Sequence, residues 1–492
     1  MSEFITGPSE QGLYRLAAGT LLVAFQGTTA PDWVLRELDN GLGGVTLFGF
    51  NVADPDQLSA LTSRLRAAGD PVVSLDEEGG DVTRLAYHVG SPYPGNAALG
   101  AVDDVELTRS VYRSIGDDLA RCGVNLDMAP DADVNTADDN PVIGTRAFGS
   151  DAALVARHTV AAVHGLQSAG VAACVKHFPG HGATRQDSHL EVPLVDASLE
   201  LLHERELVPF RAAIEAGTKS IMTAHVRVPA LTGDLPATLS PAALTGLLRG
   251  ELGYDGVVVS DALDMKAITD AYGLAGGAVL SLAAGTDLLC LGPLPTEDDV
   301  RRIIAGIVAA VRDGRLPVSR LEEAAERVAR LRTWFGEPRQ VAAGENVIGL
   351  TAARRAVSLT GSASPLVDPL VVEVDTPPTI AVGDVPWGFA PWLSRAEIVR
   401  VKPESADVSG LLARAEGRSL VVVVKDAHRY EASRTVVSAL LATRPDATVV
   451  EMGLPIWRPA GTTYLATYGA ARANAQAAAE LLNLRAPEPS AP

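Results

Sequence analysis

The sequence predicts an α/β protein: a (β/α)8 TIM-type barrel followed by an α/β sandwich domain. The 492 residues exceed one ordinary domain. Eight short apolar runs alternate with helical stretches between Gly19 and about Phe335, and a second β/α series follows residue 350. Runs that are apolar throughout are typical of strands buried on both faces, and strict alternation favours parallel pairing. A closed barrel therefore fits the first series best, and an open doubly wound sheet is the alternative.

The expected barrel strands are short and rich in branched apolar residues. They cover Gly19–Phe25, Gly44–Phe50, Pro71–Asp76, Val124–Met128, Ala172–His177, Ser220–His225, Gly256–Asp261 and Asp287–Leu291. Stretches between them have apolar residues at helical spacing. Examples are Val105–Cys122, Leu154–Ala169, Leu199–Ala216, Pro241–Leu252 and Val300–Arg312. We assign residues 1–336 to the barrel domain.

Between Glu337 and Thr351 the pattern gives way to Pro, Gly and polar residues, which predicts a linker at residues 337–350. The second β/α series then predicts an α/β sandwich domain over residues 351–492. Its expected strands are Leu370–Val374, Thr379–Val382, Glu397–Val401, Ser419–Val424 and Ala447–Met452. Its expected helices are Val408–Glu416, Ala432–Thr443 and Ala470–Leu482.

Composition excludes several classes of protein. With 47% hydrophobic and 21% charged residues the chain is globular, and its net charge of −19 disfavours binding to nucleic acid or to an anionic membrane surface. No apolar run reaches the roughly 20 residues that span a bilayer. Met1–Gly12 has no basic segment followed by an apolar one, so we expect a cytoplasmic protein. Oligomeric state is left unpredicted.

The chain has three cysteines, Cys122, Cys174 and Cys290, all in apolar settings and without C-x-x-C spacing. This pattern favours buried free thiols over a disulfide framework or a thiolate metal site.

Polar residues interrupt the apolar runs at their carboxyl ends. Asp76, Lys176 with His177, His225 and Asp261 all stand at such positions. In a barrel this end carries the active site, so we expect these side chains to converge on one pocket.

The segment from Lys176 to His189 is the most informative, because it combines glycines and a proline with many charged groups. Asp187 stands two residues before His189, and a carboxylate at that spacing fixes the tautomer of the imidazole and leaves its other nitrogen free to move a proton. This predicts a general acid/base pair. Two alternatives remain at this point. Either His181 or His189 ties down a loop, or a metal is bound by the set His177, His181, Asp187 and His189, which the neighbouring Lys176 disfavours.

Asp261 ends a buried strand, where a rigid backbone would hold a nucleophile; a helix cap is the alternative. Asp76 and Glu78 with Arg84, and the later Arg146, supply carboxylates and guanidinium groups that suit sugar hydroxyls. A buried salt bridge is the competing interpretation.

Four motifs in order resemble glycoside hydrolase family 3, in its β-N-acetylglucosaminidase branch with two domains. They are Asp76-x-Glu78-Gly79-Gly80-x-Val82-x-Arg84, Asn140-Pro141-Val142-Ile143-Gly144-x-Arg146, Lys176-His177-Phe178-Pro179-Gly180-His181-Gly182 with Asp187-Ser188-His189, and Ser260-Asp261-Ala262-Leu263-x-Met265.

The resemblance implies that Asp261 is the nucleophile, His189 the acid/base and Asp187 its orienting partner. It implies that the terminal N-acetylglucosamine is held by Asp76, Arg84, Arg146, Lys176 and His177. The implied reaction is a retaining double displacement that needs no metal or organic cofactor, acting on a carbohydrate such as an oligosaccharide or a cell-wall muropeptide.

Three other functions are weighed. A phosphorylase would use the same residues, because a neutral imidazole does not repel phosphate as a carboxylate base would. A family 3 β-glucosidase would draw a Glu from the second domain, where Glu431, Glu451 and Glu480 lack a recognisable motif. A non-catalytic sugar-binding protein is disfavoured because the three implied catalytic residues are all present.

Overall fold

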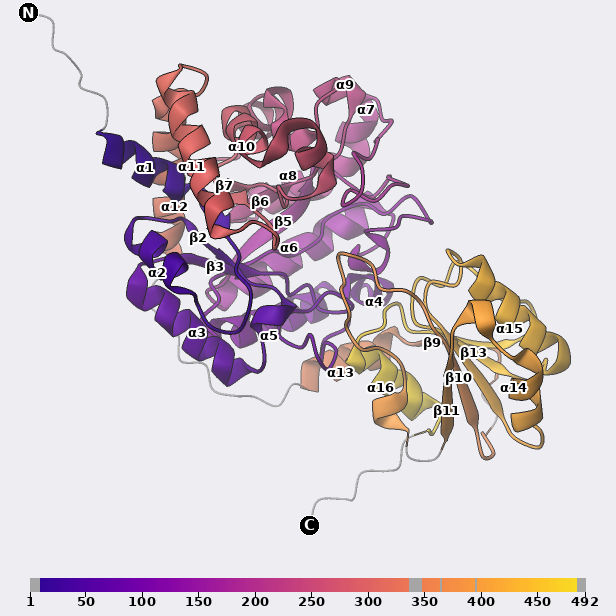
Figure 1. Cartoon of the computed structure of the whole chain (residues 1–492). Coiled ribbons are helices and arrows are strands. Elements are labelled where there is room, and N and C mark those ends of the chain that lie inside the picture. The colour runs from indigo at the N-terminus through magenta and orange to yellow at the C-terminus, as the bar shows by residue number, and fades with distance from the viewer. Residues whose placement is uncertain (1–8, 336–346, 363–364, 394–395, 485–492) are drawn as a thin grey trace, which may run out of the picture.

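The computed structural model describes residues 9–335, 347–362, 365–393 and 396–484. Two α/β units lie side by side, and the first is the larger (Figure 1). One contains an eight-stranded sheet and the other a six-stranded sheet.

The first sheet is the predicted barrel. Its strands are β1 (Leu21–Val23), β2 (Gly44–Thr46), β3 (Val72–Leu75), β4 (Leu126–Asp127), β5 (Ala172–Phe178), β6 (Ser220–Thr223), β7 (Val257–Val259) and β8 (Leu289–Cys290). All pair in parallel in the order β7-β6-β5-β4-β3-β2-β1-β8. A parallel bridge between Val259 and Leu288 joins the two ends of this order, so the sheet closes. The strands are buried throughout, as the apolar runs predicted.

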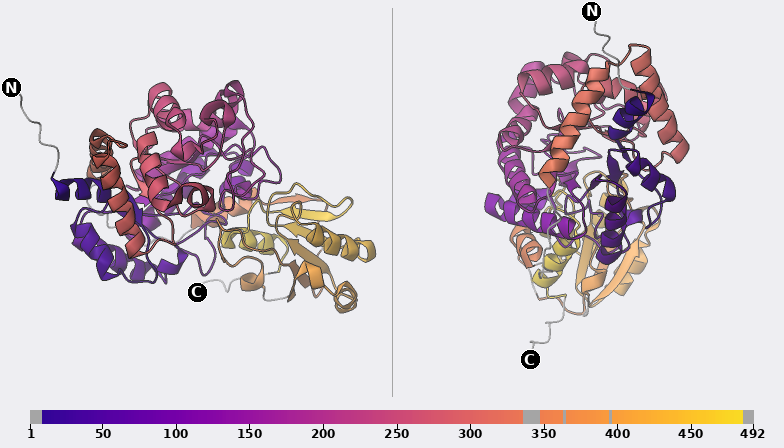
Figure 2. Two further views of the ribbon diagram at one scale, coloured as in Figure 1. Left: turned by 45° about the horizontal axis from the view of Figure 1, so that its top comes forward. Right: turned by 90° about the vertical axis from the view of Figure 1, so that its left-hand side faces the viewer.

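Helices form the outer layer around these strands (Figure 2). They are α1 (Glu10–Gly19), α2 (Asp32–Asp39), α3 (Pro55–Ala68), α4 (Asn96–Val102), α5 (Val105–Arg121), α6 (Ala152–Ser168), α7 (Leu199–Leu201), α8 (Leu207–Glu215), α9 (Pro229–Thr232), α10 (Lys266–Ala284), α11 (Glu297–Arg312) and α12 (Val318–Phe335). Two predicted helices are π-helical in part or throughout, at Leu202–Glu206 and Ala242–Glu251. Apolar spacing predicts a helical segment but not which carbonyl each N–H reaches.

Helix α10 has 19 residues and an 18-residue window with a mean hydropathy of 1.3, of which 44% is buried in the protein. By length and composition it would cross a bilayer, which is weak evidence, since core helices share both properties. The helix is interrupted at Gly273, where φ is 64°, and it packs against α11 and α12.

The second domain is a mixed sheet between helices. Its strands are β9 (Ser358–Thr360), β10 (Leu370–Val374), β11 (Glu397–Val401), β12 (Leu420–Val424), β13 (Thr448–Glu451) and β14 (Thr463–Ala466), in the order β11-β10-β12-β13-β14-β9. Only the β14–β9 pair is antiparallel among these. Its helices are α13 (Val347–Ala356), α14 (Val408–Arg414), α15 (Glu431–Thr443) and α16 (Arg472–Leu481).

The predicted strand Thr379–Val382 is wrong: this segment is a loop and turn that leaves the sheet. Pro377 and Pro378 precede it and supply no backbone N–H for a ladder. The carbonyls of Ala381 and Val382 instead accept hydrogen bonds from Arg84 of the barrel, at 2.9 and 3.1 Å.

Most of the predicted linker, residues 337–346, lies outside the described residues. The remaining part begins α13, which packs on α16 of the second domain and on α4 and α5 of the barrel. The boundaries at residues 336 and 350 stay predictions.

Candidate active site

A cavity of about 440 Å³ opens at the carboxyl ends of the barrel strands. Seven of the eight residues predicted for the site line it, namely Asp76, Arg84, Arg146, Lys176, His177, His189 and Asp261. The eighth, Asp187, contacts His189 directly. The eight therefore gather at one place, although they span almost 190 positions of the sequence.

Lys176 lies at the closed end of the cavity and is 1% exposed. Its ammonium lies 2.6 Å from Asp76 and 2.7 Å from Glu78. Burial alone would lower the pKa of Lys176, but the two carboxylates outweigh burial and raise it above its usual range. Lys176 is thus a fixed positive charge that can donate to a bound hydroxyl.

Arg146 donates two hydrogen bonds to the Glu78 carboxylate, at 2.7 and 2.9 Å. The Glu78 carboxyl is buried, which would raise its pKa, yet Arg146 and Lys176 hold that pKa well below its usual range. Arg84 lies 3.7 Å from Asp76. Both interpretations from sequence hold together here: the groups form buried ion pairs, and they also line the cavity.

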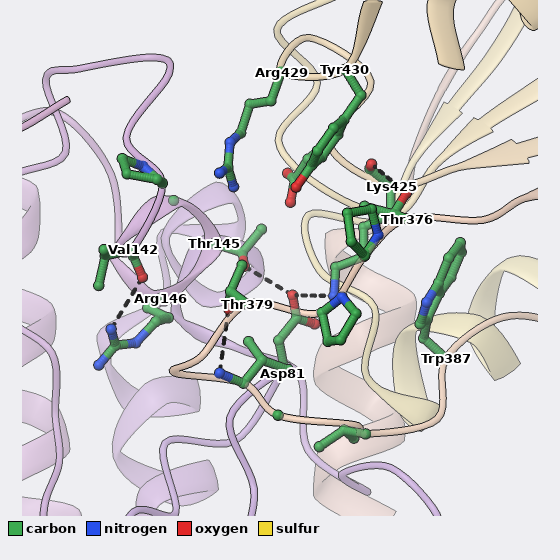
Figure 3. A pocket seen from close by; sticks show the side chains of 18 of the residues that line it. Asp81, Val142, Thr145, Arg146, Thr376, Thr379, Trp387, Lys425, Arg429 and Tyr430 are labelled. Carbon is green, nitrogen blue, oxygen red and sulfur yellow. Dashed lines mark hydrogen bonds and ion pairs between the residues drawn. The ribbon is translucent and has the colours of Figure 1, made fainter. Parts of the chain in front are cut away.

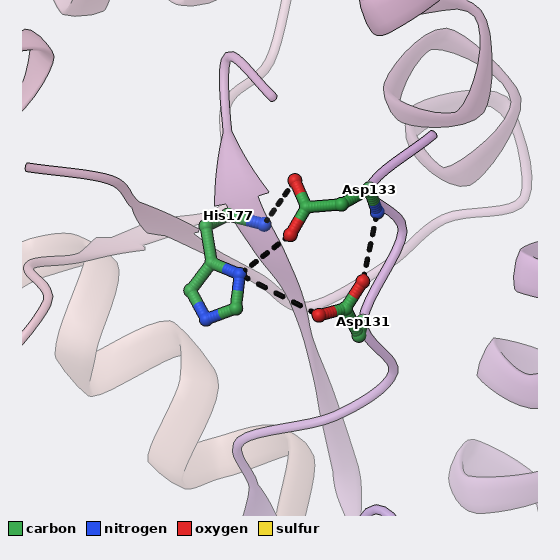
Figure 4. Close-up of side chains that lie close together, drawn as sticks. All are labelled: Asp131, Asp133 and His177. Carbon is green, nitrogen blue, oxygen red and sulfur yellow. Dashed lines mark hydrogen bonds and ion pairs between the residues drawn. The ribbon is translucent and has the colours of Figure 1, made fainter. Parts of the chain in front are cut away.

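His177 is positioned by two carboxylates on the loop after β4 (Figure 4). Its Nδ1 lies 2.7 Å from Asp133 and 3.7 Å from Asp131. Burial and the repulsion from Asp133 raise the pKa of Asp131 well above its usual value. Burial acts to raise the pKa of Asp133 too, but His177 outweighs burial and lowers it. Asp133 is therefore the more readily ionised of the two carboxyl groups.

The same three side chains offer ligand atoms within 4.8 Å of one another. The guanidinium of Arg146 lies only 3.9 Å from Asp131, so the cluster already has a positive charge beside it. We therefore interpret the cluster as support for His177 rather than as a metal centre. The ligand set considered from sequence, with His181, Asp187 and His189, does not gather within that distance among the described residues.

His189 and Asp187 form the predicted pair. The Nδ1 atom of His189 lies 2.7 Å from Asp187 Oδ1, which also accepts the backbone N–H of His189 at 2.9 Å. Burial would raise the pKa of Asp187, but the hydrogen bonds from His189 lower it. The carboxylate therefore holds the ring by Nδ1 and leaves Nε2 free to exchange a proton.

Asp261 follows β7 and is held by backbone contacts. Its Oδ1 accepts the N–H of Ala262 at 2.8 Å. Burial raises the pKa of Asp261, and the nearby His225, His177 and His189 together bring it below the usual value. The carboxylate is ionised, as a nucleophile must be. It caps no helix, since α10 begins five residues later.

The second domain contributes to the cavity through Ile380 and Ala381. Arg84 fixes this turn by the two carbonyl contacts described above. Among the described residues that line the cavity, none is Glu431, Glu451 or Glu480. Glu451 is buried inside its own domain, where it accepts backbone N–H groups.

A second cavity of about 290 Å³ lies beside the first, between the domains (Figure 3). Val142 and Arg146 line both cavities. Asp81 lies at the base of the second one, where Lys425 approaches to 3.2 Å. Arg429 and Tyr430 extend toward it from the other domain.

The sequence did not indicate Asp131 or Asp133 as site residues, although both follow β4. His225 was expected in the same pocket, but it is not among the residues that line the cavity. It lies behind Asp261 in contact with its neighbour: His225 Nε2 is 2.9 Å from the carbonyl oxygen of Ala262, and its pKa is lowered chiefly by burial. The three cysteines are free and buried, as predicted.

These motifs and this geometry agree with sequence comparison. The N-terminal domain of glycosyl hydrolase family 3 matches residues 26–331. The chain belongs to glycosyl hydrolase family 3. The match covers every barrel strand after β1 and all eight predicted site residues.

Several known proteins are similar to this chain. Beta-hexosaminidase A from Pseudoalteromonas piscicida is 34% identical over 59% of this chain, and this chain spans only 53% of its length. Beta-hexosaminidase from Nitrosomonas eutropha is 32% identical over 69% of this chain and 99% of its own length. The solved family 3 beta-N-acetylglucosaminidase from Paenibacillus sp. str. FPU-7 superimposes with a TM-score of 0.87 at 32% identity. That superposition covers 96% of this chain and 97% of the Paenibacillus chain, so both domains are shared.

Proposed function

We propose that this chain is a retaining exo-β-N-acetylglucosaminidase, which releases terminal N-acetyl-β-D-glucosamine through a covalent glycosyl-enzyme. The observation that carries the proposal is the contact of 2.7 Å between His189 and Asp187, beside the cavity that contains the ionised Asp261. The names of the similar proteins, β-hexosaminidase and β-N-acetylglucosaminidase, support the same activity.

In the first step Asp261 attacks the anomeric carbon while protonated His189 gives the Nε2 proton to the glycosidic oxygen. In the second step neutral His189 takes a proton from water, which then displaces Asp261 and restores the β configuration. Asp187 keeps the ring oriented in both steps and stabilises its charged form. The chain's own residues account for every proton transfer.

The charged end of the cavity explains an exo mode of action. Lys176, Arg146 and His177 are 1%, 8% and 6% exposed, so the end opposite the mouth is closed. Their donors and the Asp76 carboxylate suit the hydroxyl groups of one terminal sugar. A chain that continued beyond that sugar would meet buried protein.

Natural substrates of this activity are oligosaccharides or muropeptide fragments that end in N-acetylglucosamine. We include in the proposal a role in peptidoglycan recycling and a cytoplasmic location. The free thiols of Cys122, Cys174 and Cys290 support a reducing compartment. Fractionation of cells that make the protein, with an antibody against it, tests the location.

The proposal is tested by hydrolysis of aryl β-N-acetylglucosaminide against aryl β-glucoside, with and without phosphate. We expect the first substrate to be preferred and the product to be free N-acetylglucosamine whether or not phosphate is present. A sugar 1-phosphate product would indicate a phosphorylase, and a preference for the glucoside would indicate a β-glucosidase.

Two variants test the assigned roles. Asp261→Ala should lose nearly all turnover and still fold. His189→Ala should lose less kcat/KM with activated aryl leaving groups, which hardly need a proton, than with oligosaccharides, and its glycosyl-enzyme should be detected by mass spectrometry. His164→Ala, at an exposed position of α6, is the matched control. Equal losses on both substrates without an intermediate would place the acid/base elsewhere.

A further inference from the structure

The catalytic cavity changes character from its closed end to its mouth. The closed end is charged and buried, whereas the mouth has three exposed apolar side chains, Leu190, Leu294 and Ile380. They are 57%, 75% and 58% exposed, and all three line the same cavity. We call these three residues the apolar rim.

Single exposed apolar side chains are ordinary on protein surfaces. The rim differs because its members come from three separate segments: the loop after β5, the loop after β8 and the turn after β10 of the second domain. Apolar groups that converge on one polar cavity mark a place where a ligand presents apolar surface.

Contacts of the site itself hold the segments that carry the rim residues. The backbone N–H of Leu190, which follows His189, donates to the carbonyl of Asp187 at 3.0 Å. The backbone N–H of Leu294 donates to Asp264 Oδ2 at 2.9 Å. Ile380 precedes Ala381, whose carbonyl accepts from Arg84 at 2.9 Å. The rim is therefore held in place relative to the sugar-binding groups, and the fixed turn at Ile380 joins the two domains at this point.

The reaction determines which part of the substrate meets the rim. The sugar occupies the charged end, and His189 must lie against the glycosidic oxygen. The group beyond that oxygen then extends from His189 toward the mouth, past Leu190. We propose that Leu190, Leu294 and Ile380 form an aglycone subsite that takes an apolar face, either the C–H face of a second pyranose ring or an aryl group. This inference rests on the proposed function and adds that the second domain selects the aglycone.

The test compares Ile380→Ser and Leu294→Ser with the matched control Ile456→Ser. Ile456 is 41% exposed and lies in the same domain as Ile380, but it is not among the residues that line this cavity. Each enzyme is assayed with the aryl β-glycoside, the β-1,4 disaccharide and the methyl β-glycoside of N-acetylglucosamine. We expect kcat/KM to fall about 5- to 30-fold for the aryl substrate, the disaccharide or both, the loss from exposing part of one aliphatic side chain. The substrate that loses more identifies the aglycone source.

The methyl glycoside, whose aglycone is too small to reach the rim, should change less than about twofold, and inhibition by free N-acetylglucosamine should not change. Equal losses for all three substrates would place the rim on the sugar ring, and no loss for any would remove the subsite; either result overturns the inference. So would an aglycone-dependent loss in Lys266→Gln alone, which would mean that charge holds the aglycone. A wild-type enzyme inactive on all three substrates would instead refute the proposed function.

Discussion

Asp261 and Asp264 are two carboxylates of one short segment whose surroundings drive their ionisation apart. The pKa of Asp261 is lowered by three histidines that outweigh burial. Burial raises the pKa of Asp264 to about 6, and its Oδ2 accepts the backbone N–H of Leu294 at 2.9 Å. Such a separation of neighbouring carboxylates is a feature of acid/base sites.

Asp264→Asn should therefore stabilise the protein in a pH-dependent way. Below the ordinary pKa of about 3.9 the carboxyl is protonated in both the folded and unfolded states, so its ionisation does not change the free energy of unfolding. As pH rises toward 6 the unfolded state releases the proton while the folded state keeps it, so the folded state loses stability, and above pH 6 the loss is constant. Denaturation of both proteins should show the variant gaining roughly 2 kcal/mol more at pH 7.5 than at pH 4.

The matched control is Asp298→Asn, because the Asp298 side chain is 79% exposed on α11. Its effect on the free energy of unfolding should stay within about 0.5 kcal/mol at both pH values. A gain from Asp264→Asn of the same size at both pH values would contradict the assigned titration.

At the scale of elements, the loops after β4 and β5 act as one unit because Asn140 joins them. Its Nδ2 donates to the carbonyl of His181 at 2.9 Å, and its Oδ1 accepts the N–H groups of Val142 and Ile143 at 3.0 and 2.9 Å. Asn140 thereby positions the turn before Arg146 against the segment that begins with Lys176.

Asn140→Ala should lower the free energy of unfolding by about 1–3 kcal/mol, because three buried backbone groups lose their partner. It should also lower kcat/KM at least tenfold through misplacement of Arg146. Thermal unfolding and steady-state kinetics measure the two effects.

Asn125→Ala is the control, since Asn125 makes similar bonds to Val73 and Pro71 at the opposite end of the barrel. It should lose stability and keep kcat/KM; a similar loss of kcat/KM in both variants would refute the role of Asn140.

Elements that depend on local pattern could be predicted from the sequence, and those that depend on distant partners could not. All eight barrel strands lie where apolar runs predicted them. Strand β14 was not recognised, because it depends on pairing with its neighbour β13. The turn at Thr379–Val382 was not recognised, because it is bound by Arg84, about 300 positions away in the sequence. For the same reason Asp133, 44 positions before His177, was not expected to orient it.

At the scale of the whole molecule, the two domains meet around Asp81. This barrel residue accepts the N–H of Ala470 at 2.8 Å and the hydroxyl of Thr145 at 3.1 Å, and it pairs with Lys425 at 3.2 Å. Burial would lower the pKa of Lys425, but Asp81 and then Asp426 raise it. Asp81 therefore keeps a cation of the second domain charged beside the catalytic cavity, close to the turn that contains Ile380.

Asp81→Asn should loosen the second domain on the barrel. An amide of the same shape places N–H groups toward Lys425 or Ala470, so the interface loses about 3 kcal/mol, the usual loss when one partner of a buried pair is removed. Calorimetry should show two separate unfolding transitions where the wild type has one, and KM for the disaccharide should rise because Ile380 is less well held. Arg355→Gln is the control: its partner Asp104 lies 2.7 Å away across the same interface, but the two side chains are 47% and 36% exposed, so the loss should stay below about 1 kcal/mol. A single transition at the wild-type temperature in Asp81→Asn would mean that the domains are held together by their packed helices, such as α13 on α5, and not by this pair.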